Sequence, residues 1–393
     1  MMSVKPDQRL SKKIHPPEED TTVIPKNIFE RLQHIKPPAL LYDLRAFKKS
    51  VRDVVEAFGT YYFPVKCNPT PELLRAAVEQ GAGLDVCSPQ ECDLAIKSGA
   101  KPGDISHTGV ALDSHGMRRM NSLGIHVNLD SIQELEQWLS EWPGRSVALR
   151  LKPVENGGYA DKFGISDLDL PQALKKINNA GARLAGIHVH FDHFANTPSG
   201  LALEYAPFLE KLTTLLVDEM PGMAYLNLGG GWPFFHGACE QMNPSDFAEA
   251  IRNQFSAPLS AAGFKGKIIV EPGEFVVADC GYWAAKVAVL KQGKDREMAI
   301  LDTITPIPSA KLPYPAVALR RKNGRLARIT GESAHHYTLA GVTNSPLDTI
   351  RESVFLPELK PGDIIVLCRA GAYLGTLMGG FHSRPTPKQH VVE

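Results

Sequence analysis

The chain alternates short apolar segments of strand length with longer helical stretches. Eight of the apolar segments are expected to be strands, at residues 61–66, 83–86, 105–107, 126–130, 146–151, 184–190, 225–228 and 267–271. A helix start follows the first of them, because Thr70 stands before Pro71 at the first helical position. Eight such units, at roughly 20 to 40 residues each, predict an α/β fold built on a (β/α)8 TIM-type barrel.

The pattern changes after Glu271 to strand-like segments separated by turn residues, with few long amphipathic helices. These segments lie at residues 283–290, 297–301, 326–330 and 363–367. We therefore expect a barrel at residues 37–282 and a separate C-terminal β-domain at residues 283–393, completed by a strand near 39–43. Residues 1–36 are charged and contain several prolines, which indicates a flexible N-terminal arm.

Composition excludes several classes of partner. The 43 basic and 43 acidic residues cancel, so the chain has no charge footprint for nucleic acid or an anionic membrane. The six cysteines form no CxxC pair, which argues against a disulfide framework. No signal-peptide pattern and no apolar run near ~18 residues is present. A cytoplasmic protein with a small-molecule partner is expected.

Lys66 follows the apolar, aromatic-rich run at residues 61–65. Burial lowers the pKa of an ammonium group, so a lysine at such a strand end can hold a carbonyl cofactor as a Schiff base. The alternative is an amphipathic lysine that extends from the sheet end into solvent, and one lysine alone does not decide between the two.

Other reactive side chains also follow predicted barrel strands, where a barrel enzyme builds its site. Asp85 ends the second strand, His190 ends the sixth and Glu271 follows the eighth. Gly229, Gly230 and Gly231 follow the seventh strand and can present bare backbone N–H groups to a phosphate. A tight turn is the alternative for three glycines, but their position favours a phosphate site.

The HxHxDH pattern formed by His188, His190, Asp192 and His193 can be mistaken for a metal site. No further ligand set accompanies it, and a metal would leave Lys66 without a role, so no metal is expected. We interpret His190 as a flat ring able to stack on an aromatic cofactor. For His188 a buried core position is the alternative, and the role of Asp192 stays open.

Eight sequence blocks are similar, in order and spacing, to those of the fold-type III pyridoxal-phosphate decarboxylases, the ornithine and diaminopimelate decarboxylase family. The blocks are PVKCNP, GLDVCSPQE, GIHVH, LNLGGGWP, EPGEFVVADCG, GVTNSPLD, GDIIVLCRAGAY and FHSRPTP. The resemblance covers residues 38–393. It implies an alanine racemase-like fold, pyridoxal 5′-phosphate as cofactor, and a homodimer whose active sites form between two subunits.

The resemblance also implies individual roles. Lys66 would form the internal aldimine, His190 would stack on the pyridine ring, and Glu271 would pair with the ring nitrogen. The three glycines would hold the phosphate, with Tyr373 near the phosphate and the Schiff base. The remaining positions on the cofactor side are Asp85, Glu91 and, buried behind them, Arg150.

Glu271 bears on the type of reaction. A carboxylate keeps the ring nitrogen protonated, which makes the cofactor a strong electron sink for the carbanion left by CO2. A racemase has reason to weaken that sink, so Glu271 favours a decarboxylase. A simple turn is the alternative reading of Glu-Pro-Gly.

Two positions depart from the family at the phosphate. Glu274 stands where relatives have an arginine that helps neutralise the phosphate, and a glutamate pointing the same way would repel it. His193 also differs from the relatives and could compensate through a hydrogen bond or a charge. Both residues are therefore candidate cofactor contacts.

A further departure concerns turnover. Asn344 stands where relatives have a cysteine that protonates the quinonoid carbon, and an amide is a poor acid. The proton would then come from water, from Lys66, or from His335, His336 or Tyr337. Asn344 and the retained Asp348 join Lys66 and His190 as candidate catalytic residues.

The substrate is less defined than the reaction. Ser345 replaces the glutamate with which diaminopimelate decarboxylases bind the distal ammonium group, which disfavours that substrate. The sequence is most similar to the siderophore-pathway branch, so we expect α-decarboxylation of an L-amino acid or of an amino-acid moiety in a larger polar conjugate. The alternatives are a carboxynorspermidine-type decarboxylase, racemisation or oxidative deamination at the same carbanion, and a non-catalytic cofactor-binding homologue.

Overall fold

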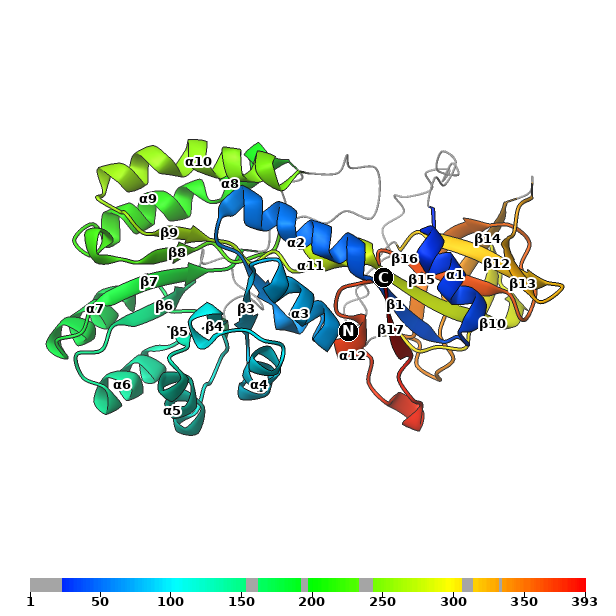
Figure 1. Cartoon of the computed structure of the whole chain (residues 1–393), viewed down its shortest axis with the longest axis horizontal. Coiled ribbons are helices and arrows are strands. Elements are labelled where there is room, and N and C mark those ends of the chain that lie inside the picture. Colours follow the sequence, from blue (N-terminus) through cyan, green and yellow to red (C-terminus); the bar gives the residue numbers. More distant parts are fainter. Residues whose placement is uncertain (1–22, 153–161, 192–196, 233–242, 306–313, 332–333) are drawn as a thin grey trace, which may run out of the picture.

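The computed structural model describes residues 23–152, 162–191, 197–232, 243–305, 314–331 and 334–393. Figure 1 shows a barrel surrounded by helices at one end of the molecule and a β-domain at the other. The predicted fold class, a (β/α)8 barrel with a C-terminal β-domain, is confirmed. Within the described residues, no helix is both long enough and apolar enough to cross a membrane.

The barrel is an eight-stranded parallel sheet in sequence order. Its strands are β2 (Tyr62–Pro64), β3 (Gly83–Val86), β4 (Ile105–His107), β5 (His126–Leu129), β6 (Val147–Leu151), β7 (Leu184–Val189), β8 (Tyr225–Asn227) and β9 (Lys267–Ile269). A parallel bridge between Tyr61 and Val270 joins the last strand to the first. Most residues of these strands are buried, as expected for parallel strands covered on both faces.

Helices cover the outside of the barrel (Figure 1). They are α2 (Leu44–Phe58), α3 (Pro71–Glu79), α4 (Pro89–Lys97), α5 (Ser114–Leu123), α6 (Ile132–Glu141), α7 (Leu170–Asn179), α8 (Pro198–Glu204), α9 (Ala206–Leu215) and α10 (Pro244–Ala261). The short helix α11 (Glu274–Val277) follows β9 and lies between the barrel and the β-domain (Figure 1). Thr70 precedes α3 as predicted, but its side chain makes no capping bond to the helix. The Thr70 hydroxyl instead donates to Oδ1 of Asn68, at 2.6 Å.

The β-domain is built on a nine-stranded mixed sheet. Its strands are β1 (Ala39–Asp43), β10 (Gly281–Gln292), β11 (Glu297–Leu301), β12 (Ala316–Lys322), β13 (Arg325–Arg328), β14 (His335–Ala340), β15 (Thr349–Leu356), β16 (Ile364–Cys368) and β17 (Lys388–Val392). β1 pairs antiparallel with β10 and parallel with β17. The short helix α12 (Leu374–Leu377) lies between β16 and β17 along the chain.

The expectation of a flexible arm over residues 1–36 is wrong for its last part. Residues Lys26–His34 form helix α1, which packs against β1, β13 and β17 (Figure 1). Ile28 and Leu32, one helical turn apart, are buried in the apolar core of the β-domain. Residues 1–22 lie outside the described residues.

Candidate active site

A cavity of about 280 Å³ lies at the carboxyl ends of the barrel strands, where the barrel meets the β-domain. The residues that line it are Pro64, Lys66, Cys67, His190, Gly231, Trp232, Glu271, Gly273, Glu274, Phe275 and Tyr373. Six of these were predicted from the sequence as site residues, although they come from five separate parts of the chain. The barrel therefore gathers most of the predicted cofactor contacts in one place.

Lys66 lies in a single turn of 3-10 helix, η1 (Val65–Cys67), directly after β2. Burial lowers the pKa of Lys66, but Cys87, Asp85, Cys67 and Glu271 surround it and raise it, so the net shift is upward. The expectation that burial alone frees the amine is thus wrong. Burial raises the pKa of Cys67 to about 11 and that of Cys87 to about 12.

Asp85 lies on β3, one residue before the strand ends at Val86, and is buried. Neither carboxyl oxygen has a partner within hydrogen-bond geometry among the described residues, although Thr108 is close enough to lower its pKa. Burial and the neighbouring Glu271 raise the pKa of Asp85, while Lys66 lowers it. A buried carboxyl group without hydrogen bonds is costly to fold, which indicates that a ligand completes its surroundings.

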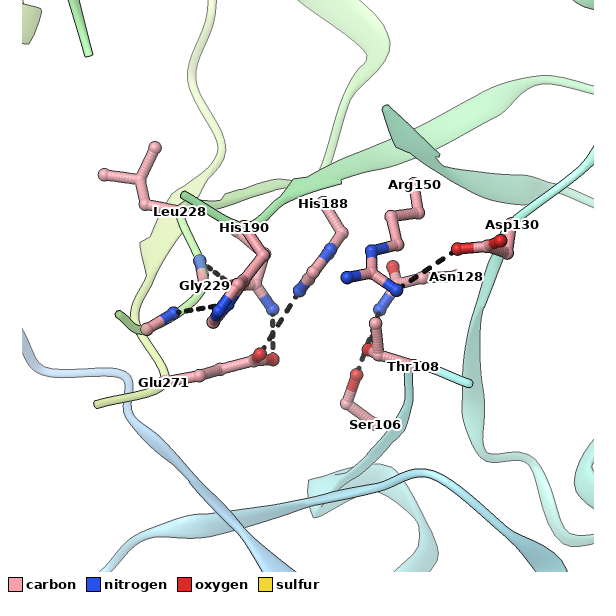
Figure 2. A network of polar contacts seen from close by, with 12 residues as sticks. Ser106, Thr108, Asn128, Asp130, Arg150, His188, His190, Leu228, Gly229 and Glu271 are labelled. Carbon is pink, nitrogen blue, oxygen red and sulfur yellow. Dashed lines mark hydrogen bonds and ion pairs between the residues drawn. The ribbon is translucent and has the colours of Figure 1, made fainter. Parts of the chain in front are cut away.

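Glu271 follows β9 and is held by two side chains (Figure 2). Its Oε2 lies 3.2 Å from Nε2 of His188, and its Oε1 accepts a 2.6 Å bond from Nδ2 of Asn227. Burial raises the pKa of Glu271, but His188, Asn227 and Lys66 outweigh it, and the pKa is lowered. Because burial lowers the pKa of His188, its ring is neutral and Nε2–H donates. Glu271 is therefore an oriented, ionised carboxylate.

The strand register explains this arrangement. Arg150 on β6 is paired with His188 on β7, which is paired with Asn227 on β8. The three side chains form one row across the barrel, and Figure 2 shows His188 between Glu271 and Arg150. Nδ1 of His188 is buried without a hydrogen-bond partner among the described residues.

The glycine loop, residues 229–231, is hydrogen-bonded to Asn227 of this row and to His190. Oδ1 of Asn227 accepts a 2.9 Å bond from the N–H of Gly229, and Nδ1 of His190 accepts one of 3.3 Å from Gly230 (Figure 2). Gly229 has a φ of 68°, in the left-handed region that favours glycine. A Cβ atom at Gly230 would overlap the backbone oxygen of Glu271. The loop needs glycine in order to pass this close to Glu271 and His190.

Tyr373 reaches the cavity from the β-domain. Its backbone has a φ of 63°, unusual for a side chain of this size, and its N–H donates to the carbonyl of Cys67 at 2.8 Å. The thiol of Cys67 also donates to the Tyr373 hydroxyl, at 3.2 Å. Nearby, Nδ2 of Asn68 donates to the carbonyl of Gly371 at 2.8 Å. These bonds join the lysine-bearing turn to the β-domain.

Arg150 and Glu91 support the site from outside the cavity. Nη1 of Arg150 pairs with Oδ1 of Asp130 at 3.2 Å, and the guanidinium lies 4.5 Å from the centre of the Phe163 ring. Burial raises the pKa of Asp130 to about 6, although Arg150 lowers it. Oε2 of Glu91 accepts a 2.7 Å bond from the N–H of Cys87.

The predicted residues of the 341–348 block do not reach this cavity. Asn344 is exposed. Asp348 is buried in the β-domain, where Oδ1 accepts bonds from N and Oγ1 of Thr305, at 2.8 and 2.7 Å, and Oδ2 accepts one of 2.8 Å from N of Thr343. Within one chain Asp348 thus organises its own loop. His193 lies outside the described residues.

The sequence patterns do not single out Asn227, and they leave a buried core position open for His188. The available signal was a polar amide in the otherwise apolar run 225–228, together with the two-residue spacing of His188 and His190. The sequence marks Cys67 only as part of the PVKCNP block. Within the described residues, no cluster of three metal-binding side chains is present.

The cavity fits a flat aromatic cofactor that carries an aldehyde, a ring nitrogen and a phosphate. Lys66 provides an amine, Glu271 an ionised carboxylate for a protonated ring nitrogen, and Gly231 places the backbone of the glycine loop in the same cavity. The carboxyl oxygens of Asp85, which have no hydrogen-bond partner among the described residues, gain one if a cationic or donor group enters beside them.

Known proteins similar to this chain agree with that chemistry. Residues 44–278 match the family described as pyridoxal-dependent decarboxylase, pyridoxal binding domain. A diaminopimelate decarboxylase of Escherichia coli is 28% identical over 399 residues, covering 93% of this chain and 91% of that protein. One of Methanothermobacter thermautotrophicus is 25% identical over 385 residues, covering 90% and 86%.

Two solved structures share the fold. The diaminopimelate decarboxylase of Helicobacter pylori, complexed with L-lysine, has a TM-score of 0.79 at 23% identity and 93% coverage of both chains. The lysine/ornithine decarboxylase of Vibrio vulnificus, complexed with putrescine, has a TM-score of 0.78 at 19% identity, covering 94% of this chain and 99% of that one.

Proposed function

The chain belongs to the family of pyridoxal-dependent decarboxylases, and from this premise we propose that it removes the α-carboxylate of an L-amino acid or of an amino-acid moiety in a larger polar conjugate. The family membership identifies an amino-acid decarboxylase that uses pyridoxal phosphate. The observation that carries the proposal is the placement of Lys66 and the ionised Glu271 in one cavity.

The bound cofactor supplies an electron sink for the electron pair that stays behind when CO2 departs. Glu271 keeps a proton at the ring nitrogen, because His188 and Asn227 hold it ionised and oriented. His190 presents its ring to the cofactor, and the hydrogen bond from Gly230 fixes its direction. Lys66 holds the carbonyl end, and the glycine loop binds the phosphate.

The proposed substrate carries a polar group far from the reacting carbon, as in a precursor of a siderophore or a related secondary metabolite. Support comes from Ser345, which offers no carboxylate for a distal ammonium group. Diaminopimelate is the second candidate substrate, because the curated relatives reported above carry that name.

We further propose that the active enzyme is a homodimer with shared sites. Asn344 is exposed and outside its own chain's cavity, while Asp348 is buried and fixes the loop that presents it. A loop held this firmly yet facing solvent is suited to completing the cavity of a second copy.

The test combines spectroscopy with product analysis. The purified protein is scanned for the absorbance band of the lysine-bound cofactor, and CO2 release is measured over a panel of amino acids, diaminopimelate and amino acids coupled to citrate. We expect the band to disappear in Lys66→Ala and to remain in Lys97→Ala, an exposed lysine on α4.

CO2 release from a panel member, with loss in Lys66→Ala, supports the decarboxylase. A band without CO2 from any member contradicts the proposed substrate class, and an identical spectrum in Lys66→Ala contradicts the role of Lys66.

A further inference from the structure

Glu274 lines the same cavity as Gly231 of the glycine loop. Trp232, Gly273 and Phe275 line this cavity as well. The rings of Trp232 and Phe275 are in contact, with centroids 5.4 Å apart. The carboxyl therefore shares the space to which the glycine loop presents its backbone.

No cation neutralises this carboxyl within the described part of the chain, since Glu274 has neither an ion pair nor a hydrogen bond there. The titratable groups that line the cavity together with Glu274 are Lys66, Cys67, His190, Glu271 and Tyr373. Tyr314 also lies near enough to interact with Glu274. Lys66 is already surrounded by Asp85 and Glu271. The hydroxyl of Tyr373 and the thiol of Cys67 both have a raised pKa and are neutral.

The electrostatics therefore leave Glu274 two ways to coexist with a phosphate. As a carboxylate it would repel the phosphate in a partly dry cavity, where charges interact strongly. As a carboxylic acid it becomes an O–H donor, and burial already raises its pKa with no neighbouring charge lowering it.

Resting on the function proposed above, we propose that Glu274 binds the cofactor phosphate as a neutral carboxylic acid, donating a hydrogen bond to a phosphate oxygen. The proton comes from solvent, so phosphate binding takes up one proton wherever Glu274 is ionised in the free chain. Affinity for a phosphate-bearing ligand then falls as pH rises.

The test uses pyridoxamine 5′-phosphate, which has no aldehyde and so leaves Lys66 chemistry aside, titrated calorimetrically into the cofactor-free protein from pH 6 to 9. Glu274→Gln keeps a hydrogen-bond donor at this position but removes the carboxyl group that titrates. We expect the ratio of wild-type Kd to Glu274→Gln Kd to rise by up to about tenfold per pH unit above the pKa of the free carboxyl. Buffers of different ionisation enthalpy should show about one more proton taken up by the wild type.

Three controls isolate the hydrogen bond. Glu79→Gln, an exposed glutamate at the end of α3, should behave as the wild type. Pyridoxamine, which lacks the phosphate, should show no difference between wild type and Glu274→Gln. Glu274→Ala should also lose the pH dependence, yet bind more weakly than Glu274→Gln at every pH, because alanine cannot donate.

A Kd ratio that does not change with pH overturns the proposal, as does equal affinity of Glu274→Ala and Glu274→Gln. A pH dependence that persists in Glu274→Gln and disappears in His193→Gln assigns the titration to the histidine and also overturns it. Failure of pyridoxal phosphate itself to bind refutes the proposed function instead, so the two failures are distinguishable.

Discussion

Asn227 holds two parts of the site with one amide. Its Nδ2 donates to Glu271 and its Oδ1 accepts from Gly229, so the contact for the ring nitrogen and the loop for the phosphate share one support. Because the side chain is buried on a strand, neither bond can be replaced by water without rearrangement.

We expect Asn227→Ala to weaken pyridoxal phosphate binding at least tenfold, since it leaves the Glu271 carboxylate and the Gly229 N–H without these partners. The unpaired buried groups should also destabilise the cofactor-free protein by about 1 to 3 kcal/mol. Fluorescence titration and urea denaturation measure the two effects.

Asn178→Ala, at an exposed position near the end of α7, is the matched control and should change neither quantity. Unaltered cofactor affinity in Asn227→Ala would show that the amide does not orient the site.

At the residue level, the sequence predicts those site residues that a local motif marks. Lys66, Glu271 and the glycines stand directly after barrel strands, so position along the chain places them near the cavity. The link from Asn227 to Glu271 depends on the register of β8 and β9, which no local pattern specifies. The raised pKa of Lys66 depends on Cys87, Asp85 and Glu271, which the fold brings beside it from other segments.

At the scale of elements, helix α1 carries an unexpected part of the β-domain core. Ile28 and Leu32 are buried against the sheet that contains β1, and the side chain of Gln33 bonds to the backbone of Leu326 on β13. A helix on this sheet covers apolar surface that would otherwise face solvent.

Ile28→Ala should therefore destabilise the protein by about 2 to 5 kcal/mol, the cost of removing a buried branched side chain and leaving a cavity. Urea denaturation of the cofactor-free protein measures the change. Val23→Ala provides the comparison, because Val23 is 75% exposed, and should shift stability by no more than about 0.5 kcal/mol. Equal stability of the two variants would mean that α1 contributes little to the free energy of unfolding.

The barrel strands were predictable because burial on both faces produces continuous apolar runs. In the β-domain, β14 and β15 were not recognised, since polar residues such as His335 and Glu352 interrupt their half-buried patterns. Helix α1 was missed for a related reason. Only Ile28 and Leu32 are fully buried in it, within a region rich in proline and charge.

For the whole molecule, the cavity walls come from both domains. Tyr373 belongs to the β-domain and bonds to Cys67 in the lysine-bearing turn of the barrel. The loop at 341–348 belongs to the β-domain as well, but none of its residues lines its own chain's cavity. A dimer would thus bring three walls together, two from one chain and one from its partner.

Mixing two inactive variants tests this arrangement. Lys66→Ala lacks the lysine and Asp348→Ala releases the loop, so an exchanged mixed dimer regains one native site in two. Equal mixtures should recover about a quarter of wild-type CO2 release after random exchange of subunits.

Mixing Lys66→Ala with Glu271→Ala should recover nothing, because both residues line the cavity of the same chain. Sedimentation shows whether each variant still forms dimers. Recovery absent from the first mixture, despite dimers and subunit exchange, would contradict shared sites.

The position of β1 between β10 and β17 has a consequence for biosynthesis. On the ribosome β1 emerges before the whole barrel, while both of its partners emerge after it. The barrel can therefore close around Lys66 while Ala39–Asp43, buried in the finished fold, still lacks its neighbours. Tyr373 also arrives late, so a nascent chain that stalls after the barrel holds the reactive lysine without the wall that encloses it. Synthesis of β17 completes the pairing of β1 after all the barrel strands have been made, so the first strand of the chain is among the last to be fully paired.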